Sequence, residues 1–209
     1  MKKTLALIVC GALMLPVAGC SKEVPVSSEN TEAQTTSAAQ TETAQTEGAA
    51  ADNSDDQFVS AYPAFAVTSE SLDGNIWIET CSNTEDGENA SPELSWEPVE
   101  GAAVYVIYMV DINANNFLHW KSADVTETNL PQGWAPSSDY VGPYPPSGQT
   151  HQYNIYVFAL KAPVERVKGS INTPAAKIQE FMESLDTDAD GNTGNIVAVG
   201  RITGNYTAK

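Results

Sequence analysis

Three apolar runs constrain the fold of this chain more than any other feature. They are rich in β-branched and aromatic residues and contain few polar ones: 104–110 (VYVIYMV), 153–160 (YNIYVFAL) and 196–203 (IVAVGRIT). Runs of this length and composition are typical of strands that are covered on both faces of a sheet. We therefore predict a mainly β protein with these strands in its core.

One helix is predicted near the C-terminal end. Thr173 is a suitable N-cap and Pro174 suits the first turn of a helix. Apolar residues then repeat at helical spacing, at Ile178, Phe181, Met182 and Leu185. Such a stripe covers one face of a sheet, so we expect one or two helices at the periphery of the β structure.

The N-terminal region has the features of a lipoprotein signal peptide. A basic start precedes an apolar stretch, 4–18, which has the length of a signal-peptide core and is too short to span a bilayer. It ends in LPVAGC, which resembles a lipobox, so residues 1–19 are predicted to be removed and Cys20 to be lipidated. An ordinary secretory signal is the alternative. Two acyl chains would hold the protein stably on the extracytoplasmic face of the cell membrane.

Residues 20–56 are predicted to be a disordered tether. They include no aromatic residue and carry eight acidic side chains and one basic side chain. A segment of this composition cannot bury enough apolar surface to offset the entropy lost on ordering. The folded domain is therefore predicted to span 57–209, which is long enough for one hydrophobic core.

The charge of the chain excludes some partners. The formal net charge is −17, and 57–209 alone has 19 acidic and seven basic residues. Such a field repels nucleic-acid phosphates and anionic lipid headgroups. We therefore expect no nucleic-acid partner, and we expect the link to the membrane to be covalent.

An acidic hexapeptide after the predicted helix matches the first half of a calcium loop. Aspartates at alternate positions and a glycine at the sixth are the features of such loops, here Asp186, Asp188, Asp190 and Gly191. The twelfth position is Val197, where a glutamate is expected. Two interpretations stand: a nonstandard Ca²⁺ loop completed by a nearby asparagine, and a solvated acidic turn. No other cofactor is predicted.

The two histidines of the chain, His119 and His151, each lie at the end of a β-rich run beside turn-forming residues. Asp111 ends the first run, where a charged side chain should face solvent or a polar cavity. Because side chains alternate along a strand, Asp111 shares a face with Asn113, and His151 shares a face with Tyr153. Either the histidines meet Asp111 in a small polar pocket, or each is structural and bonded to backbone.

Five ordered motifs give the chain a family resemblance. They are SPELSW (91–96), the run that ends in Asp111, His119-Trp120, Gly142-Pro143 with Pro145-Pro146, and His151-Gln152-Tyr153. In this order they resemble the phosphatidylethanolamine-binding protein (PEBP) family, in its bacterial Raf-kinase-inhibitor-like branch, over roughly residues 58–206. The resemblance implies a PEBP-like β-sandwich, with a large antiparallel sheet packed on a smaller sheet in a Greek-key arrangement.

The resemblance also implies a binding pocket. In the family this pocket holds small anions such as phosphate or a phospholipid headgroup, and its residues correspond here to Asp111, His119, Gly142, Pro143, His151 and Tyr153. The two imidazoles would donate hydrogen bonds to phosphate oxygens, and the carboxylate would orient an imidazole or accept from a headgroup ammonium.

The chain departs from the family pattern around this pocket. The usual Asp-Pro-Asp-Ala-Pro is Asp-Ile-Asn-Ala-Asn at 111–115, so Asn113 keeps a hydrogen-bonding group but loses the charge, and both prolines are gone. The usual arginine after the second histidine is Gln152. The loss of this positive group favours a neutral or zwitterionic ligand.

Three functions are compatible with these features. The first is a membrane-anchored extracytoplasmic binding protein for a small anionic or zwitterionic ligand. The second is a protein-interaction module that inhibits or regulates an envelope protease or a kinase ectodomain. The third is a phosphoester hydrolase that uses Asp111 and the histidines as acid and base. The sequence contains no Gly-x-Ser-x-Gly motif and no convincing set of catalytic metal ligands, so we expect a binding protein and not an enzyme.

Overall fold

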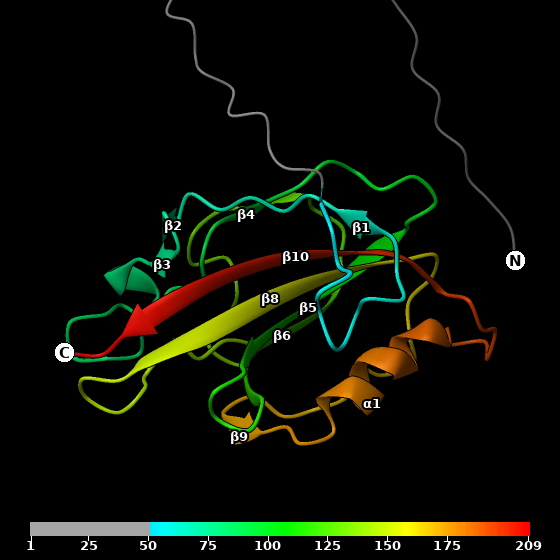
Figure 1. Ribbon diagram of the computed structural model, residues 1–209. Helices are drawn as coiled ribbons and strands as arrows, with labels where there is room; N and C mark the ends of the chain where they lie inside the picture. Colours follow the sequence, from blue (N-terminus) through cyan, green and yellow to red (C-terminus); the bar gives the residue numbers. More distant parts are fainter. Residues whose placement is uncertain (1–50) are drawn as a thin grey trace, which may run out of the picture. The chain divides into compact units, whose positions relative to one another are not determined.

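Three long strands lie side by side at the centre of the molecule. They are β5 (Val104–Asp111), β8 (Thr150–Leu160) and β10 (Ile196–Thr207), and β8 pairs antiparallel with the other two (Figure 1). Each contains one of the three apolar runs. Every residue of β5 is buried, which agrees with the prediction of strands covered on both faces.

The computed structural model describes residues 51–209. The predicted signal peptide, the predicted lipidation site Cys20 and residues 21–50 of the predicted tether lie outside the described residues. Within 51–209, no helix combines the length and the apolar composition that crossing a membrane requires.

The large sheet is mixed rather than wholly antiparallel. Its order is β2-β3-β10-β8-β5-β6-β9, β1 also pairs with β10, and β4 and β7 form a separate small sheet. Both β1 and β3 run parallel to β10. The expected mainly β fold, with a large sheet, a smaller sheet and a helix, is confirmed. The remaining strands are β1 (Ala64–Phe65), β2 (Leu72–Asp73), β3 (Ile76–Trp77), β4 (Leu94–Ser95), β6 (Phe117–Val125), β7 (Asn129–Leu130) and β9 (Thr173–Pro174).

The helix α1 (Ile178–Glu183) begins later than predicted. Thr173 does not cap it, because Thr173 and Pro174 form β9 and pair with the start of β6. Tertiary pairing has therefore overridden the local capping preference. The predicted apolar stripe is correct, since it faces the large sheet and three of its four residues, Ile178, Met182 and Leu185, are buried.

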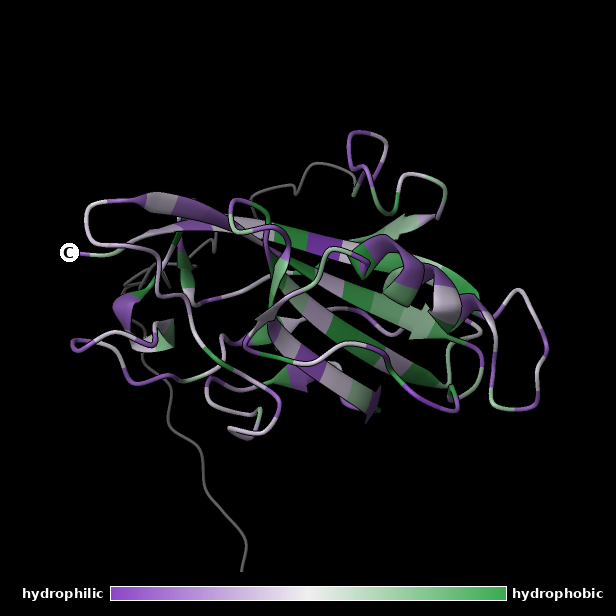
Figure 2. Cartoon of the chain, turned by 90° about the horizontal axis from the view of Figure 1, so that it is seen from below, coloured by the Kyte–Doolittle hydropathy of each residue, from purple (hydrophilic) through white to green (hydrophobic). Residues whose placement is uncertain are grey.

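Each face of the large sheet carries its own apolar layer. One face packs against the small β4–β7 sheet and contains Trp77, Trp120 and Ile155. The other face packs against α1 and the 58–62 segment and contains Tyr108, Phe158 and Val199. Figure 2 shows the hydrophobic colour along the strands and hydrophilic colour toward the strand ends near the C-terminus. A functional site is therefore best sought at the polar strand ends.

Residues 53–56 pack against the large sheet, although the predicted domain begins at residue 57. The Asn53 side-chain amide donates to the Val199 carbonyl at 2.9 Å. Asp56 is 6% exposed and accepts hydrogen bonds from the Tyr156 hydroxyl and the Arg201 guanidinium. Polar side chains make these contacts. The predicted boundary at residue 57 depended on the lack of aromatic residues before it, which gives no information about polar contacts.

Candidate functional site

The ends of β5, β6 and β8 surround a cavity of about 310 Å³. Strand register brings its residues together, because Asp111 on β5 is the partner of Phe117 on β6 and of Tyr153 on β8. His119 and His151 lie two residues from these partners and so share their face of the sheet. The lining consists of Asp111, Ala114, Phe117, His119, Tyr144, Pro145, Pro146, His151 and Tyr153.

The Asp111 carboxylate is buried and held on both of its oxygens. Oδ2 lies 2.6 Å from Nδ1 of His151. Oδ1 accepts from the backbone N–H groups of Asn113 and Ala114, at 2.8 Å and 3.1 Å. The carboxylate therefore has a fixed orientation at the base of the cavity.

His119 contributes an acceptor to the cavity instead of the expected donor. Its Nδ1 lies 2.8 Å from the Val141 carbonyl, which can only accept, so Nδ1 carries the proton. Burial lowers the pKa of His119, and the nearby Val141 carbonyl and Asp111 carboxylate only partly oppose this effect. The ring is therefore neutral at pH 7, and its Nε2 carries a lone pair. The prediction that both imidazoles donate to an anion is not supported for His119.

Aromatic rings form most of the remaining wall. The ring centroid of His119 lies 5.1 Å from those of Phe117 and Tyr153 and 5.7 Å from that of Tyr144. Tyr144 is 39% exposed and forms the rim, where its hydroxyl donates to Asn172 at 2.7 Å. Faces of aromatic rings attract cations, so this wall favours a ligand with a positively charged group.

The Tyr153 hydroxyl is an unpaired polar group in the cavity wall. It is enclosed and has no hydrogen-bond partner within residues 51–209. Burial raises the pKa of Tyr153, and the nearby Asp111 carboxylate raises it further, although the two groups do not meet hydrogen-bond geometry. An unpaired buried hydroxyl is destabilising by about 1–3 kcal/mol.

Three of the predicted site residues support the cavity from outside its lining. Gly142 donates its backbone N–H to the Asn89 side chain at 2.7 Å, and the Pro143 carbonyl accepts from the backbone of Asn83 at 2.9 Å. The Asn113 side chain accepts from the backbone N–H of Gln152 at 2.8 Å. These contacts fix the two turns that carry the lining residues. The other four predicted residues, Asp111, His119, His151 and Tyr153, meet around the cavity.

Two aromatic lining residues, Phe117 and Tyr144, are absent from the predicted site. Phe117 could have been found from the sequence, because it lies two residues before His119 on one strand and must share its face. Tyr144 had no such signal. It lies in the loop between Gly142 and Pro145, whose path no periodicity predicts.

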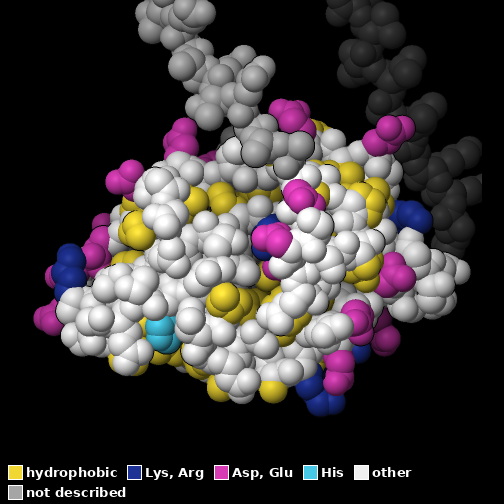
Figure 3. Space-filling model, viewed as in Figure 1, with side chains coloured by type: hydrophobic (Ala, Val, Ile, Leu, Met, Phe, Trp, Pro, Cys, Tyr) yellow, Lys and Arg dark blue, Asp and Glu magenta, His cyan; other side chains and the backbone are white. Residues whose placement is uncertain are grey.

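The lining of the cavity carries no permanently charged cation. It contains one carboxylate and two imidazoles but no lysine or arginine. Figure 3 shows a histidine at the surface next to hydrophobic side chains, with acidic side chains spread over the same face. Both the local and the overall charge therefore disfavour a ligand that carries only negative charge.

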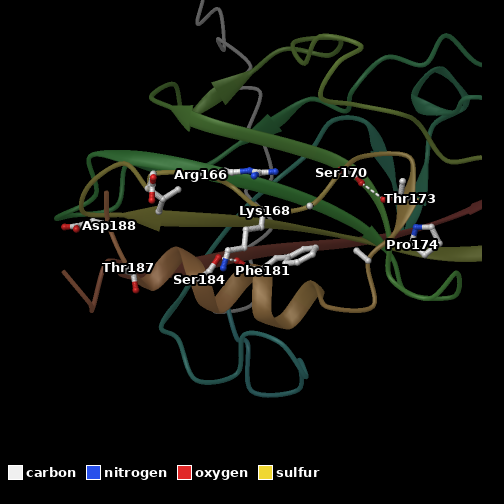
Figure 4. A pocket seen from close by; sticks show the side chains of 13 residues that line it. Arg166, Lys168, Ser170, Thr173, Pro174, Phe181, Ser184, Thr187 and Asp188 are labelled. Atoms are coloured by element: carbon white, nitrogen blue, oxygen red, sulfur yellow. Dashed lines mark hydrogen bonds between the residues drawn. The ribbon is translucent and has the colours of Figure 1, made fainter. Parts of the chain in front are cut away.

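A larger hollow of about 820 Å³ lies between α1 and the 164–170 loop (Figure 4). Its charged side chains are balanced, with Arg166 and Lys168 opposing Glu165 and Asp188. Asp188 already accepts hydrogen bonds from its own loop. This hollow lacks the convergent buried polar groups of the smaller cavity, so we do not assign it as the functional site.

The acidic hexapeptide does not form a metal-binding cluster. Within 51–209 no three His, Cys, Asp or Glu side chains are close enough to share a metal ion. Asp186 accepts from the backbone N–H groups of Gly194 and Ile196, both at 3.1 Å, and Asp188 accepts from that of Asn192 at 2.8 Å. Asp186 and Asp188 thus bind the backbone of their own turn, and both interpretations of the hexapeptide, which has Asp190 as its third carboxylate, stay predictions.

Comparison with known proteins gives a consistent result. The profile of the family described as phosphatidylethanolamine-binding protein matches residues 68–207. A UPF0098 protein of Methanothermobacter thermautotrophicus is 27% identical in an alignment of 144 residues that covers 59% of this chain and 86% of the relative.

Two solved structures share the fold. One is YbcL of E. coli, described as a new member of the mammalian PEBP family, which has a TM-score of 0.52 and 24% identity over 69% of this chain and 99% of that chain. The other is a PEBP homologue of Chlamydia trachomatis, with a TM-score of 0.52 and 22% identity over 70% of this chain and 99% of that chain. At these identities the likeness concerns the fold alone.

Proposed function

The chain belongs to the phosphatidylethanolamine-binding protein family, and on this premise we propose that its cavity binds a small zwitterionic ligand with the chemistry of a phospholipid headgroup. One observation carries the proposal: a buried, fixed carboxylate lies among aromatic rings in a cavity whose lining contains no lysine or arginine. Asp111 and the rings would take the ammonium end, because both attract cations. The acidic end would face the mouth, where His151 is partly exposed.

We propose binding rather than catalysis. The cavity lining includes no serine, threonine, cysteine or lysine, and the side chains most often used as covalent nucleophiles are therefore absent from it. Asp111 is already committed to His151 and to two backbone N–H groups, which suits a fixed recognition group.

Isothermal titration calorimetry with three probes tests the ligand class. We expect O-phosphoethanolamine to bind more tightly than either inorganic phosphate or ethanolamine. Asp111→Asn should weaken O-phosphoethanolamine binding by about tenfold or more, since it removes a buried charge that faces the ammonium group. Asp139→Asn is the control, because Asp139 is a half-buried carboxylate that bonds Ser122 and Ser138 away from the cavity. Phosphate binding as tight as O-phosphoethanolamine binding would contradict the proposal.

We further propose that the protein acts as a lipoprotein on the extracytoplasmic face of a cell membrane and belongs to the bacterial Raf-kinase-inhibitor-like branch. The LPVAGC motif before and at Cys20 supports the first part, and the ordered motifs from Ser91 to Tyr153 support the second. In cells, the wild type should fractionate with membranes and incorporate labelled fatty acid. Cys20→Ser should do neither. Labelling that survives this substitution would exclude Cys20 as the lipidation site.

A further inference from the structure

A series of hydrogen-bonded side chains runs along β8 on the face opposite the cavity. Gln152, Asn154 and Tyr156 alternate with His151 and Tyr153, so they point to the other side of the sheet. The Gln152 side-chain amide donates to Oδ1 of Asn154 at 3.0 Å, and the Asn154 amide donates to the Tyr156 hydroxyl at 3.1 Å. Three successive residues on one strand face are thus joined directly.

This series ends at the N-terminal segment. The Tyr156 hydroxyl donates to Oδ2 of Asp56 at 2.9 Å, and Nη1 of Arg201 donates to the same oxygen at 3.2 Å. Every side-chain hydrogen bond from Gln152 onward therefore points toward one buried carboxylate. Hydrogen bonds aligned in this way polarise and strengthen one another.

The other end of the series reaches the cavity. The backbone N–H of Gln152 donates to the Asn113 side chain at 2.8 Å, and the backbone N–H of Asn113 donates to Oδ1 of Asp111 at 2.8 Å. Oδ2 of Asp111 then meets His151. The connection passes from one face of the sheet to the other through the turn after β5. We call Asp56, Tyr156, Asn154, Gln152 and Asn113 the polar ladder.

Burial makes the inner part of the polar ladder difficult to rearrange. Asn154 is 4% exposed and Tyr156 is fully buried, so neither can replace a lost partner with bulk water. A buried polar group without a partner is strongly disfavoured, and its neighbours reorient to satisfy it. The loss of a partner at Asp56 is therefore expected to be relieved by reorientation along β8, toward the less buried Gln152 and Asn113.

We propose that the polar ladder positions the Asp111–His151 pair, and that Asp56 thereby influences the geometry of the cavity. Its members are positioning residues, since none of them lines the cavity, whereas Asp111 and His151 do. The inference concerns the cavity whichever ligand it holds, so it can be tested without one. It implies that events at the start of the domain, where the predicted tether joins it, are felt at the binding site.

Long-range ¹H–¹⁵N NMR of the histidine rings tests the proposal in the full chain. The protein has two histidines, so two ring systems are expected. Tyr156→Phe keeps the buried ring but removes the hydroxyl between Asn154 and Asp56. We expect the Nδ1 resonance of His151 to shift by more than its line width, while that of His119, which is bonded to the Val141 carbonyl outside the ladder, stays in place.

Two further variants separate positioning from general destabilisation. Tyr108→Phe is the matched control, because Tyr108 is the β5 partner of Tyr156, is equally buried, and donates to the Lys168 carbonyl outside the ladder. It should leave the His151 resonance unchanged. Asp56→Ala should reproduce the shift, and Asp56→Asn, which keeps an acceptor oxygen, should restore part of it. A His151 resonance that is unchanged in Tyr156→Phe, or that moves equally in Tyr108→Phe, would overturn the proposal.

Discussion

His119 shows how burial sets the charge of a single side chain. The ring is 3% exposed and its pKa is lowered from the ordinary value of 6.5, chiefly by desolvation. In the unfolded chain the ring regains that ordinary value and binds a proton more readily. A lower pH therefore favours unfolding at this residue, because the unfolded state binds a proton at His119 more readily than the folded state does.

The unfolding free energy should consequently fall as the pH is lowered from 7 through 6.5 toward 5. His119→Asn should remove this part of the pH dependence, because an amide can donate to the Val141 carbonyl but does not titrate in this range. Urea titrations of both proteins at several pH values measure this difference. An identical pH dependence in the two proteins would show that His119 is not protonated on unfolding.

Tyr153 allows the penalty of an unpaired hydroxyl to be measured. Tyr153→Phe should make the protein more stable, by about 1–3 kcal/mol, because it removes the unpaired hydroxyl and the hydroxyl has no partner to lose. Tyr140→Phe is the matched comparison, since the Tyr140 hydroxyl donates to the Cys81 carbonyl at 2.7 Å. This variant should lose about 1 kcal/mol or more. Urea unfolding decides the matter, and a destabilised Tyr153→Phe would indicate a partner such as bound water.

At the scale of the element, the 141–149 loop forms the mouth of the cavity. A Cβ on Gly142 would lie 2.1 Å from the Cys81 carbonyl and 2.8 Å from the backbone nitrogen of Asn83. Backbone atoms cannot turn aside as a side-chain tip can. The loop must therefore move if this residue is enlarged, and the Val141 carbonyl that orients His119 must move with it.

Gly142→Ala is expected to weaken O-phosphoethanolamine binding severely and to lower the unfolding free energy by about 1–3 kcal/mol, as overpacking does. Gly148→Ala is the control in the same loop: a Cβ there meets nothing within 4 Å, and only its φ of +74° is unfavourable for alanine. That variant should lose about 1 kcal/mol of stability and bind normally. Calorimetry and urea unfolding of both proteins measure these effects. If Gly142→Ala bound O-phosphoethanolamine like the wild type, the expected displacement of the loop would be contradicted.

Strands were easier to predict than the elements around them. The runs that became β5, β8 and β10 have a composition that only a covered strand explains, and the ordered motifs correctly indicated the family. The predicted start of α1 was wrong because the sequence Thr173-Pro174 is compatible both with a helix N-terminus and with a short edge strand. Pairing with β6 decides between them, and that contact is not local in the sequence.

The candidate site was predictable only where its residues belong to a local sequence pattern. Asp111, His119 and His151 carry motifs, and strand alternation places Tyr153 beside His151. The support given by Asn113 to Gln152 joins a side chain to a distant backbone N–H, for which a sequence has no signature. The neutral state of His119 was likewise unpredictable, because it depends on burial in the finished structure.

At the scale of the whole molecule, net charge should govern how ligands approach. The chain carries −17, and this field repels anions at distances up to the Debye length, about 10 Å at 0.1 M salt. Association of an anionic probe such as inorganic phosphate should therefore become faster as salt rises from about 20 to 150 mM, whereas that of ethanolamine should slow. Rate measurements across this range test it. The opposite salt dependence would contradict this prediction and would indicate positive charge at the mouth of the cavity.

The attachment of residues 53–56 has a mechanical consequence. A force applied to the N-terminal side of the domain would first stretch the hydrogen bond from Asn53 to Val199. It would then stretch the bonds that Asp56 accepts from Tyr156 and Arg201, so these contacts bear the tension one after another. Contacts loaded in sequence yield at lower force than a strand sheared from a sheet. The start of the domain should therefore peel away under strain that leaves the central strands intact.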